Sequence, residues 1–323
     1  MTEPVRIGVM GCADIARRRM LPAFAAAKDV EIAAIASRDL AKAMPLAAEH
    51  GCRAVGGYDK LLADASVMAV YLPLPPALHA GWIEAALLAG KHVLAEKPMT
   101  IDAASTTGLL ALAASRGLVL MENLSFVHHS QHATVRALLD DGTIGELRSL
   151  HAAFTVPLRS GDDIRYRSDL GGGALWDTGV YPVRVALDFL GASLRVAGAV
   201  QWRRPEFPVD TGGAALLVDR GGVSAQLTFG LDHGYRSAYR LDGSKGSISV
   251  ERAFTPPADH EPVVLVENRG GTRVVRLRAE DQVANTVASF AAAVRSGARP
   301  NDDSRYQAEL IDAIRSSFEP PAR

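Results

Sequence analysis

The chain of 323 residues is 48% hydrophobic, and its 35 basic residues nearly balance 36 acidic ones, leaving a net charge of −1. This balance provides no overall field that would attract nucleic acid or an anionic membrane surface. The two cysteines, Cys12 and Cys52, offer neither a disulfide framework nor a metal-ligand spacing, so we expect a reducing, cytoplasmic location and no metal. We find no signal-peptide pattern and no apolar run long enough to span a bilayer, and the length suggests about two domains.

Short apolar runs alternate with segments of helical period in the first third of the chain. The runs that predict strands are Val5–Met10, Glu31–Ser37, Val67–Pro73, His92–Glu96 and Leu118–Glu122. The segments that predict helices between them are Ile15–Ala27, Leu40–His50, Leu78–Leu88 and Ala103–Arg116. Because the strands are continuously apolar and separated by helices, we expect a parallel sheet covered on both faces.

The pattern changes after about Asn123, where strand-like runs become frequent. Helices are predicted at about His128–Asp141 and Ala174–Leu190, with a strand at Leu147–Val156 between them. Further strands are predicted at Arg195–Arg203, Ala214–Asp219, Val223–Leu231, Ser237–Asp242, Ser247–Arg252, Val263–Glu267 and Arg273–Leu277. Two final helices, Gln282–Ser296 and Ser304–Ser316, close the chain. We expect an α+β domain over residues 125–323 with a large, mainly antiparallel open sheet. An alternative placement packs the last helices back on the first domain.

A glycine-rich turn follows the first predicted strand. In Gly11-Cys12-Ala13-Asp14-Ile15-Ala16, small residues stand where a dinucleotide-binding loop has its glycines or alanine. Such residues allow a sharp turn and close approach of the backbone to a pyrophosphate, which then lies at a helix N-terminus. The residues expected to contact the cofactor here are Gly11, Cys12, Ala13, Asp14 and Ile15. This predicts a dinucleotide-binding domain over residues 1–124, although a simple tight turn is the alternative.

The end of the second predicted strand bears on the choice of cofactor. An NAD enzyme usually places an acidic residue there for the ribose 2′-hydroxyl, whereas this chain has Ser37 and Arg38. A hydroxyl and a guanidinium suit a 2′-phosphate, which favours NADP(H). Asp39 is the competing signal; we interpret it as the N-cap of the next helix. If Asp39 faced the ribose instead, NAD would be favoured.

Three further strand ends contribute to the expected site. The proline-rich stretch from Leu72 and Pro73 to His79 either walls the cofactor crevice or simply starts a helix. Asn123, at the end of the last strand, is expected near the nicotinamide or substrate. Glu96 and Lys97 end a strand at the sheet edge where ligands bind. The residues of these strand ends that we expect to contact the cofactor are Leu72, Pro73, His79, Glu96, Lys97 and Asn123.

Lys97 precedes Pro98, which biases the lysine towards extended geometry. The Lys97–Pro98 bond is either trans, as most X-Pro bonds are, or cis. A lysine beside a bound cofactor can donate a hydrogen bond to a substrate oxygen, whereas the alternative interpretation is a solvated lysine at a strand end.

A second constellation lies near the middle of the chain. Gly171-Gly172-Gly173 precedes Asp177 and Tyr181, which are four positions apart and would share one face of a helix. Tyrosine and lysine are both normally protonated at neutral pH, so both can donate to a carbonyl oxygen that becomes an alkoxide. The alternative for Tyr181 is a core aromatic residue whose hydroxyl is satisfied.

Two groups of cationic side chains have weaker assignments. Arg159, Arg165 and Arg167 just before the glycines could bind a substrate diphosphate or form a solvated basic loop. His128 and His132 have a spacing that can bind metal on a helix, but no carboxylate or cysteine partner is evident.

The chain resembles the Gfo/Idh/MocA oxidoreductases over essentially its whole length. The resemblance rests on three motifs in this order and spacing: the Gly11 loop, Glu96-Lys97-Pro98, and the glycine triplet followed by Asp177 and Tyr181. The resemblance implies an N-terminal Rossmann domain and a C-terminal α/β domain whose open sheet commonly forms homodimers or homotetramers. It also implies that Lys97 and Asp177 line the substrate site. Many members have histidine where this chain has Tyr181, which indicates the branch with glucose–fructose oxidoreductase, dihydrodiol dehydrogenases and nucleotide-sugar 3-ketoreductases. The Gly11 loop, Ser37-Arg38 and the stretch from Leu74 to His79 resemble the last group most.

We therefore expect NADPH-dependent reduction of a keto-sugar, in particular a dTDP-linked 3-keto-deoxysugar in deoxysugar biosynthesis. Lys97 would polarise the carbonyl oxygen, Tyr181 would give the proton, and Asp177 would orient Tyr181 or hold a sugar hydroxyl. The residues expected to bind substrate are Lys97, Arg159, Arg165, Asp177 and Tyr181. The alternatives are an NADP-linked sugar or dihydrodiol dehydrogenase, and a sensor that binds NADP without turnover.

Overall fold

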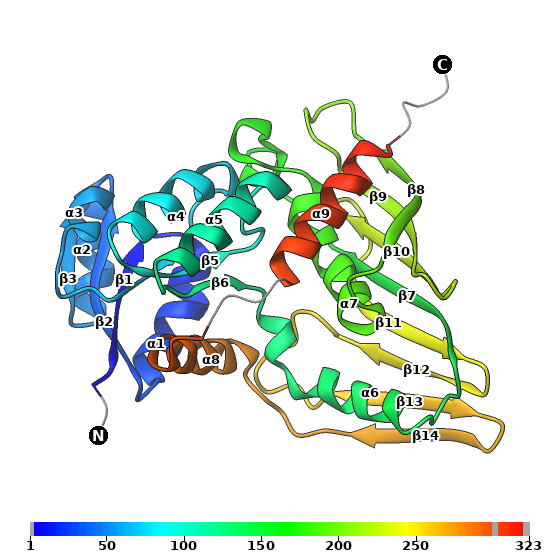
Figure 1. Ribbon diagram of the computed structural model, residues 1–323. Helices are drawn as coiled ribbons and strands as arrows, with labels where there is room; N and C mark the ends of the chain where they lie inside the picture. The colour runs from blue at the N-terminus through cyan, green and yellow to red at the C-terminus, as the bar shows by residue number, and fades with distance from the viewer. Residues whose placement is uncertain (1–2, 299–302, 319–323) are drawn as a thin grey trace. The chain divides into compact units, whose positions relative to one another are not determined.

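The computed structural model describes residues 3–298 and 303–318, which divide into two compact units (Figure 1). Unit 1 contains residues 3–128 together with 282–298 and 303–304. Unit 2 contains residues 129–281 and 305–318. Among the described residues, no helix has the length and apolar character needed to cross a membrane.

Unit 1 is built on a six-stranded sheet in the order β3-β2-β1-β4-β5-β6, in which every pairing is parallel. Its strands are β1 (Val5–Met10), β2 (Val30–Ser37), β3 (Arg53–Gly56), β4 (Ala69–Leu72), β5 (His92–Glu96) and β6 (Leu120–Asn123). Its helices are η1 (Ala16–Met20), α1 (Leu21–Ala26), α2 (Leu40–Glu49), α3 (Tyr58–Leu62), η2 (Pro76–Leu78), α4 (His79–Leu88), α5 (Ala103–Ser115), η3 (Ser125–His128) and α8 (Gln282–Ser296). The chain leaves β1 on one side for β2 and β3 and returns on the other for β4 to β6, so the carboxyl ends of β1 and β4 form the switch point where ligands bind in such sheets.

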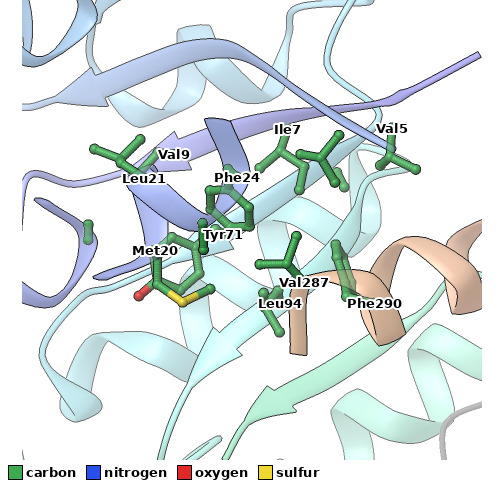
Figure 2. Close-up of a cluster of buried hydrophobic side chains, with 14 of the residues drawn as sticks. Val5, Ile7, Val9, Met20, Leu21, Phe24, Tyr71, Leu94, Val287 and Phe290 are labelled. Carbon is green, nitrogen blue, oxygen red and sulfur yellow. The ribbon is translucent and has the colours of Figure 1, made fainter. Parts of the chain in front are cut away.

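Both faces of this sheet are buried, because successive side chains of each strand point to opposite faces. Ile7 and Tyr71 point into one core, whereas Val70 and Met10 point into the other. Figure 2 shows the first core, where Phe290 from α8 packs with side chains of the early strands and helices. The buried residues of α8 thus complete a core that begins at Val5.

Unit 2 contains an eight-stranded sheet in the order β14-β13-β12-β11-β7-β10-β9-β8. Its strands are β7 (Leu147–Thr155), β8 (Arg195–Trp202), β9 (Gly212–Val218), β10 (Ser224–Gly230), β11 (Arg236–Gly243), β12 (Gly246–Glu251), β13 (Val263–Asn268) and β14 (Gly271–Arg276). Its helices are α6 (Ser130–Asp140), η4 (Ile164–Tyr166), η5 (Ser168–Leu170), η6 (Leu175–Gly179), α7 (Val180–Leu190) and, apart from its first two residues, α9 (Asp303–Ser316). All strand pairs are antiparallel except β7 with β10. α7 packs on β7 and β10 and covers one face of the sheet.

The expected fold class, a Rossmann domain with a second, mainly antiparallel open sheet, is confirmed. The sequence reading missed β3 and α3, which lie between α2 and β4. Two expected helices, Ile15–Ala27 and Ala174–Leu190, each contain a π-helical segment, η1 and η6. The domain boundary expected after residue 124 stays a prediction; in the structure α8 belongs to unit 1.

Candidate functional site

The turn after β1 has the geometry expected for a dinucleotide loop. Gly11 donates its N–H to the carbonyl of Ala36 at 2.9 Å and adopts a φ of +125°. A Cβ atom at Gly11 would lie 3.1 Å from Cδ2 of Leu74. Both the backbone conformation and the space therefore require glycine. Ala16 is fully buried, which brings the following helix close to the sheet.

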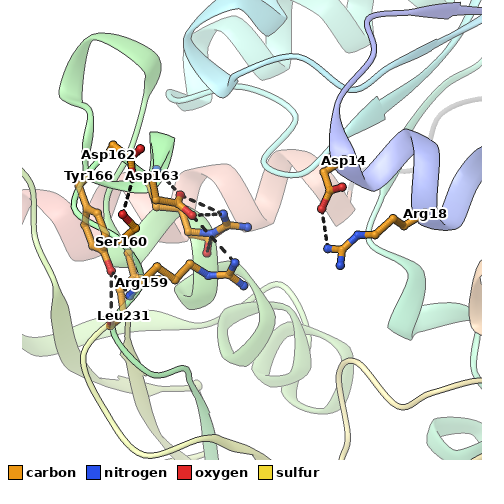
Figure 3. A network of polar contacts seen from close by, with 10 residues as sticks. Asp14, Arg18, Arg159, Ser160, Asp162, Asp163, Tyr166 and Leu231 are labelled. Atoms are coloured by element: carbon orange, nitrogen blue, oxygen red, sulfur yellow. Dashed lines mark hydrogen bonds and ion pairs between the residues drawn. The ribbon is translucent and has the colours of Figure 1, made fainter. Parts of the chain in front are cut away.

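The residues between Gly11 and Ala16 open the helix. Cys12 and Ala13 are partly buried, whereas Asp14 and Ile15 are exposed at the first helical turn. Asp14 pairs with Arg18 at 2.6 Å (Figure 3). The first N–H groups of a helix have no partner within it, so this end can receive a phosphate.

The end of β2 presents a hydroxyl and a cationic side chain. Ser37 is buried, and its hydroxyl accepts a hydrogen bond from the N–H of Asp39 at 3.2 Å. The Asp39 carboxylate accepts the N–H of Ala41 at 3.0 Å, which confirms that Asp39 is the N-cap of α2. Arg38 is exposed beside it. The carboxylate that would have favoured NAD is thus used by the helix, while Ser37 and Arg38 fit a 2′-phosphate.

Lys42 and Tyr58, which the sequence analysis did not name, act on Cys12 and Arg38 respectively. Burial raises the pKa of the Cys12 thiol, while a hydrogen bond with Ser37 and the charge of Lys42 act in the opposite direction. Burial also raises the pKa of Tyr58, which hydrogen-bonds to Arg38. Arg38 follows Ser37 directly and Lys42 acts on Cys12, and both cations are exposed, so the local charge favours an anion.

The loop after β4 encloses His79 completely. The imidazole is 0% exposed, with Nε2 2.7 Å from the Leu74 carbonyl oxygen and Nδ1 2.8 Å from the Pro98 carbonyl oxygen. Leu72 and Pro73 are also buried, next to the Gly11 turn. His79, which we expected to contact the cofactor, is thus fully buried, and both of its ring nitrogens face loop carbonyl groups.

Glu96, at the end of β5, joins the ends of its two neighbouring strands. Its Oε1 accepts hydrogen bonds from the hydroxyl of Tyr71 at 2.7 Å and from Nδ2 of Asn123 at 2.6 Å. The Asn123 amide oxygen in turn accepts the hydroxyl of Ser125 at 3.0 Å. Loss of solvation raises the pKa of Glu96, although these hydrogen bonds and the charge of Lys97 act in the opposite direction. Glu96 and Asn123 thus build the sheet edge next to Lys97.

Lys97 follows directly and is partly exposed at the carboxyl end of β5. The Lys97–Pro98 peptide bond is cis. The next N–H, that of Met99, donates to Oε1 of Glu122 at 2.8 Å, and Glu122 is itself buried. The backbone around Lys97 is therefore held by side chains of adjacent elements.

In unit 2, the glycine triplet lets two stretches of backbone approach closely. Gly172 donates its N–H to the carbonyl of Arg167, and Gly173 donates to that of Arg165, both at 2.9 Å. A Cβ atom at Gly172 would lie 2.4 Å from the Arg165 carbonyl oxygen. The triplet therefore fixes the arginine-containing loop against the start of the helical segment.

The helical segment η6 is fixed by an acidic cap that the sequence did not reveal. Oδ2 of Asp210 accepts the N–H of Leu175 at 2.8 Å, and the Asp210 carbonyl accepts the N–H of Ala174 at 3.0 Å. Burial raises the pKa of Asp210 to about 6. Asp210 thus holds the start of the segment that carries Asp177.

Asp177 is paired with an arginine from the preceding loop. Nε of Arg165 donates to Oδ2 of Asp177 at 2.7 Å, and its Nη1 donates to Oδ1 of Asp163 at 3.1 Å. Burial lowers the pKa of Arg165, but the two carboxylates outweigh this effect and raise the pKa above its ordinary value. The structure thus brings Arg165 and Asp177 together, two residues that the sequence named separately.

Tyr181 is the second residue of α7 and is partly buried. Its ring packs edge-to-face on Phe154 of β7 with centroids 4.6 Å apart, and it also contacts Phe254 at 5.6 Å. Asp177 lies within the π-helical segment η6 and Tyr181 within α7, so the two residues do not have the spacing expected for one regular α-helix. Two aromatic rings therefore fix the phenol ring of Tyr181.

The remaining cationic residues are mostly paired with carboxylates. Arg159, whose side chain is 51% exposed, has Nη1 3.9 Å from Asp163 (Figure 3). Arg167 pairs with Asp169 at 2.5 Å.

His132 contacts the Tyr239 hydroxyl through Nδ1 at 2.9 Å, and burial lowers the pKa of His132 to about 3. Within residues 3–298 and 303–318, no group of three or more histidine, cysteine or acidic residues could hold a metal ion.

Comparisons with known proteins match both parts of the chain. Residues 5–124 match the family model "Oxidoreductase family, NAD-binding Rossmann fold", and residues 132–249 match "GFO/IDH/MocA C-terminal domain". The dTDP-3,4-didehydro-2,6-dideoxy-alpha-D-glucose 3-reductase of Streptomyces violaceoruber is 56% identical over 97% of this chain and 95% of its own length. The enzyme of the same name from Actinomadura kijaniata is 50% identical over 97% and 96%.

A solved structure is similar over nearly the whole chain. KijD10, a 3-ketoreductase from Actinomadura kijaniata in complex with NADP and TDP-benzene, has a TM-score of 0.94, is 50% identical, and the match covers 98% of each chain. Variants of KijD10 with one lysine or one tyrosine replaced have also been crystallised with the same two ligands. With both domain models matched and relatives this similar over their full length, the chain belongs to the Gfo/Idh/MocA family of oxidoreductases.

Proposed function

We propose that this protein is an NADPH-dependent reductase that converts the 3-keto group of a dTDP-linked 3-keto-deoxysugar to a hydroxyl group. The observation that carries the proposal is the full-length similarity to 3-reductases of this class, joined to a structural match with a ketoreductase bound to NADP and a TDP derivative. The residues that we propose for cofactor and substrate lie at strand ends and near helix starts of this chain.

The chain fits NADP(H) at the carboxyl edge of the unit 1 sheet. The Gly11 turn, where a Cβ atom would meet Leu74, and the helix start from Cys12 to Ile15 suit a pyrophosphate. Ser37 and Arg38 suit the 2′-phosphate, since Asp39 already caps α2. When bound, NADPH supplies the hydride for the substrate carbonyl carbon.

We assign the polarising role to Lys97 and the proton-donating role to Tyr181. An ammonium hydrogen-bonded to the carbonyl oxygen stabilises the negative charge that develops there. A phenol can then give its proton to that oxygen. The lysine and the tyrosine replaced in the KijD10 variants are separated by the same number of positions as Lys97 and Tyr181, which supports this assignment. Asp177, held by Arg165, orients Tyr181 or receives a sugar hydroxyl.

The first experiment measures the turnover of a Lys97 variant with dTDP-3,4-didehydro-2,6-dideoxy-alpha-D-glucose, the substrate in the names of the relatives. We expect Lys97→Ala to lower kcat by about 100-fold or more, because one charged donor to a developing oxyanion contributes about that much. NADPH binding, followed by its fluorescence, should change much less. Lys60→Ala, which removes an exposed lysine of α3, is the matched control and should keep full turnover.

Tyr181→Phe tests the proton-donating role separately, because the ring and its contacts with Phe154 and Phe254 are kept while the hydroxyl is lost.

Equal turnover of Lys97→Ala and the unmodified enzyme would contradict the lysine assignment. Absence of any NADPH oxidation with dTDP-keto-sugars, together with activity on free sugars or dihydrodiols and NADP, would instead favour a dehydrogenase. Tight NADP binding without any turnover would favour a sensor.

We assign recognition of the substrate diphosphate to Arg159 and Arg165. Arg165 uses Nε and Nη1 for carboxylates, but a guanidinium has five N–H donors, so donors remain. Arg159 is half exposed and lies 3.9 Å from its carboxylate partner, so a diphosphate can compete for it. Arg159→Gln should raise KM for the nucleotide sugar about tenfold, with little change in kcat; an unchanged KM would remove Arg159 from the binding site.

We further propose a cytoplasmic homodimer or homotetramer that uses the open face of the unit 2 sheet. Strand register places Val200, Leu216, His151, Arg240 and Val274 on this face. Val200 and Leu216 lie on the neighbouring strands β8 and β9 and are 58% and 42% exposed, and adjacent exposed apolar side chains are a feature of interaction surfaces. Leu216→Glu should convert the oligomer to monomers in sedimentation experiments, and a monomeric unmodified protein would refute the proposal.

A further inference from the structure

We propose that His79 is a positioning residue for Lys97, which acts by fixing the carbonyl group of Pro98. This inference rests on the role proposed above for Lys97. The proposal concerns the direction in which the lysine side chain leaves the backbone, and it assigns no contact between His79 and substrate.

The position of His79 joins two loops of unit 1. His79 is the first residue of α4 and is 0% exposed. Its Nδ1 lies 2.8 Å from the carbonyl oxygen of Pro98, in the residue directly after Lys97. Its Nε2 lies 2.7 Å from the carbonyl oxygen of Leu74, whose side chain faces the Gly11 turn. One ring thus connects the lysine turn with the loop beside the dinucleotide turn.

The hydrogen-bond chemistry makes the two contacts separable. A carbonyl oxygen only accepts hydrogen bonds, so each contact requires a proton on the ring nitrogen involved. A neutral imidazole can donate from only one nitrogen, whereas a protonated imidazole can donate from both. Burial lowers the pKa of His79, while the carbonyl groups of Leu74 and Pro98 raise it. An uncharged side chain can therefore be chosen that keeps either contact.

Other restraints fix the backbone on each side but leave the Pro98 carbonyl to His79. Before Lys97, the Glu96 carboxylate is held by Tyr71 and Asn123. After Pro98, the Met99 N–H is held by Glu122. A buried imidazole costs desolvation that an apolar side chain would avoid, so packing alone does not explain a histidine here. Its distinguishing property is a ring nitrogen that can donate to the carbonyl group of Pro98, the residue next to Lys97.

Two variants separate the contacts, because an asparagine amide reproduces the position of Nδ1 and a glutamine amide reproduces that of Nε2. His79→Asn keeps the bond to Pro98, and His79→Gln keeps only the bond to Leu74. We expect His79→Gln to lower kcat by about 10- to 100-fold, as small displacements of catalytic groups do. His79→Asn should keep kcat within about threefold, while KM for the dTDP-sugar and Kd for NADPH stay within about twofold in both.

A double-mutant cycle with Lys97→Ala distinguishes positioning from general structure. If His79 acts through Lys97, His79→Gln causes no further loss of kcat in the Lys97→Ala background. His92→Gln is the control, since this half-buried histidine accepts the Val119 N–H through Nδ1 at the other end of β5. A glutamine amide does not reproduce the Nδ1 position, so this variant should lower Tm but not kcat.

Three outcomes would overturn the inference. They are equal losses in His79→Asn and His79→Gln, a further loss in the double mutant, or full activity of His79→Gln while Lys97→Ala is impaired. If Lys97→Ala alone keeps full turnover, the proposed role of Lys97 fails, and the positioning role of His79 fails with it.

Discussion

The carboxylate of Asp210 caps the start of η6, the segment that carries Asp177. It accepts the Leu175 N–H at 2.8 Å, and burial raises the pKa of Asp210 from 3.8 to about 6. We consider the substitution Asp210→Asn. Asparagine is as good an N-cap as aspartate, and its amide oxygen can accept the same N–H without carrying a charge.

The sign and size of the effect follow from linkage. Because the pKa of Asp210 in the folded protein, about 6, is above its value in the unfolded chain, 3.8, its contribution to stability is fully present below pH 3.8 and is lost as the pH rises to about 6. The loss amounts to about 3 kcal/mol, and the partial exposure of Asp210 reduces it to about 1–3 kcal/mol. The amide introduced by Asp210→Asn does not ionise, so the variant escapes this loss.

The assay is urea unfolding of both proteins at about pH 4, 5, 6 and 7, followed by tryptophan fluorescence. Trp176 lies next to Leu175 and reports on the capped segment. We expect the free energy of unfolding of Asp210→Asn, relative to the unmodified protein, to increase by about 1–3 kcal/mol between pH 4 and pH 7. A difference that does not vary with pH would refute the reasoning, whatever its size.

Three further substitutions test other parts of the structure. Gly11→Ala should raise the Kd of NADPH at least about tenfold in fluorescence titrations, because a side chain is strained at φ +125° and its Cβ would meet Leu74 at 3.1 Å. Arg38→Ala should raise the KM of NADPH about 10- to 100-fold through loss of a charged hydrogen bond, with the KM of NADH as the unaffected control. Tyr71→Phe should lower the free energy of unfolding by about 1.5–3 kcal/mol, since its 2.7 Å bond to Glu96 is lost; an unchanged urea midpoint would contradict this.

The sequence predicted features whose cause is local. The apolar runs became strands because continuous hydrophobicity marks strands buried on both faces, and Asp39 became an N-cap because capping depends on the next few residues. β3 was missed because Arg53–Gly56 is only partly buried and has no continuous apolar run. As an edge strand of four residues, it is fixed mainly by pairing with β2.

The parts that the sequence did not reveal depend on contacts between distant residues. Nothing near His79 indicates that its ring lies between the carbonyl groups of Leu74 and Pro98. Likewise, the pairing of Arg165 with Asp177 and the cap from Asp210 join residues of different loops. The sequence named the chemical groups of the site, but their hydrogen-bond partners depend on how the chain returns to each group.

The placement of α8 in unit 1 has a consequence for biosynthesis. The core that contains Val5 and Ile7 also contains Val287 and Phe290, which are both fully buried. A ribosome must therefore translate the whole of residues 129–281 before the earliest strands can receive their last covering helix. Until then the nascent chain exposes an apolar surface beside β1, and chaperones can bind this surface during translation.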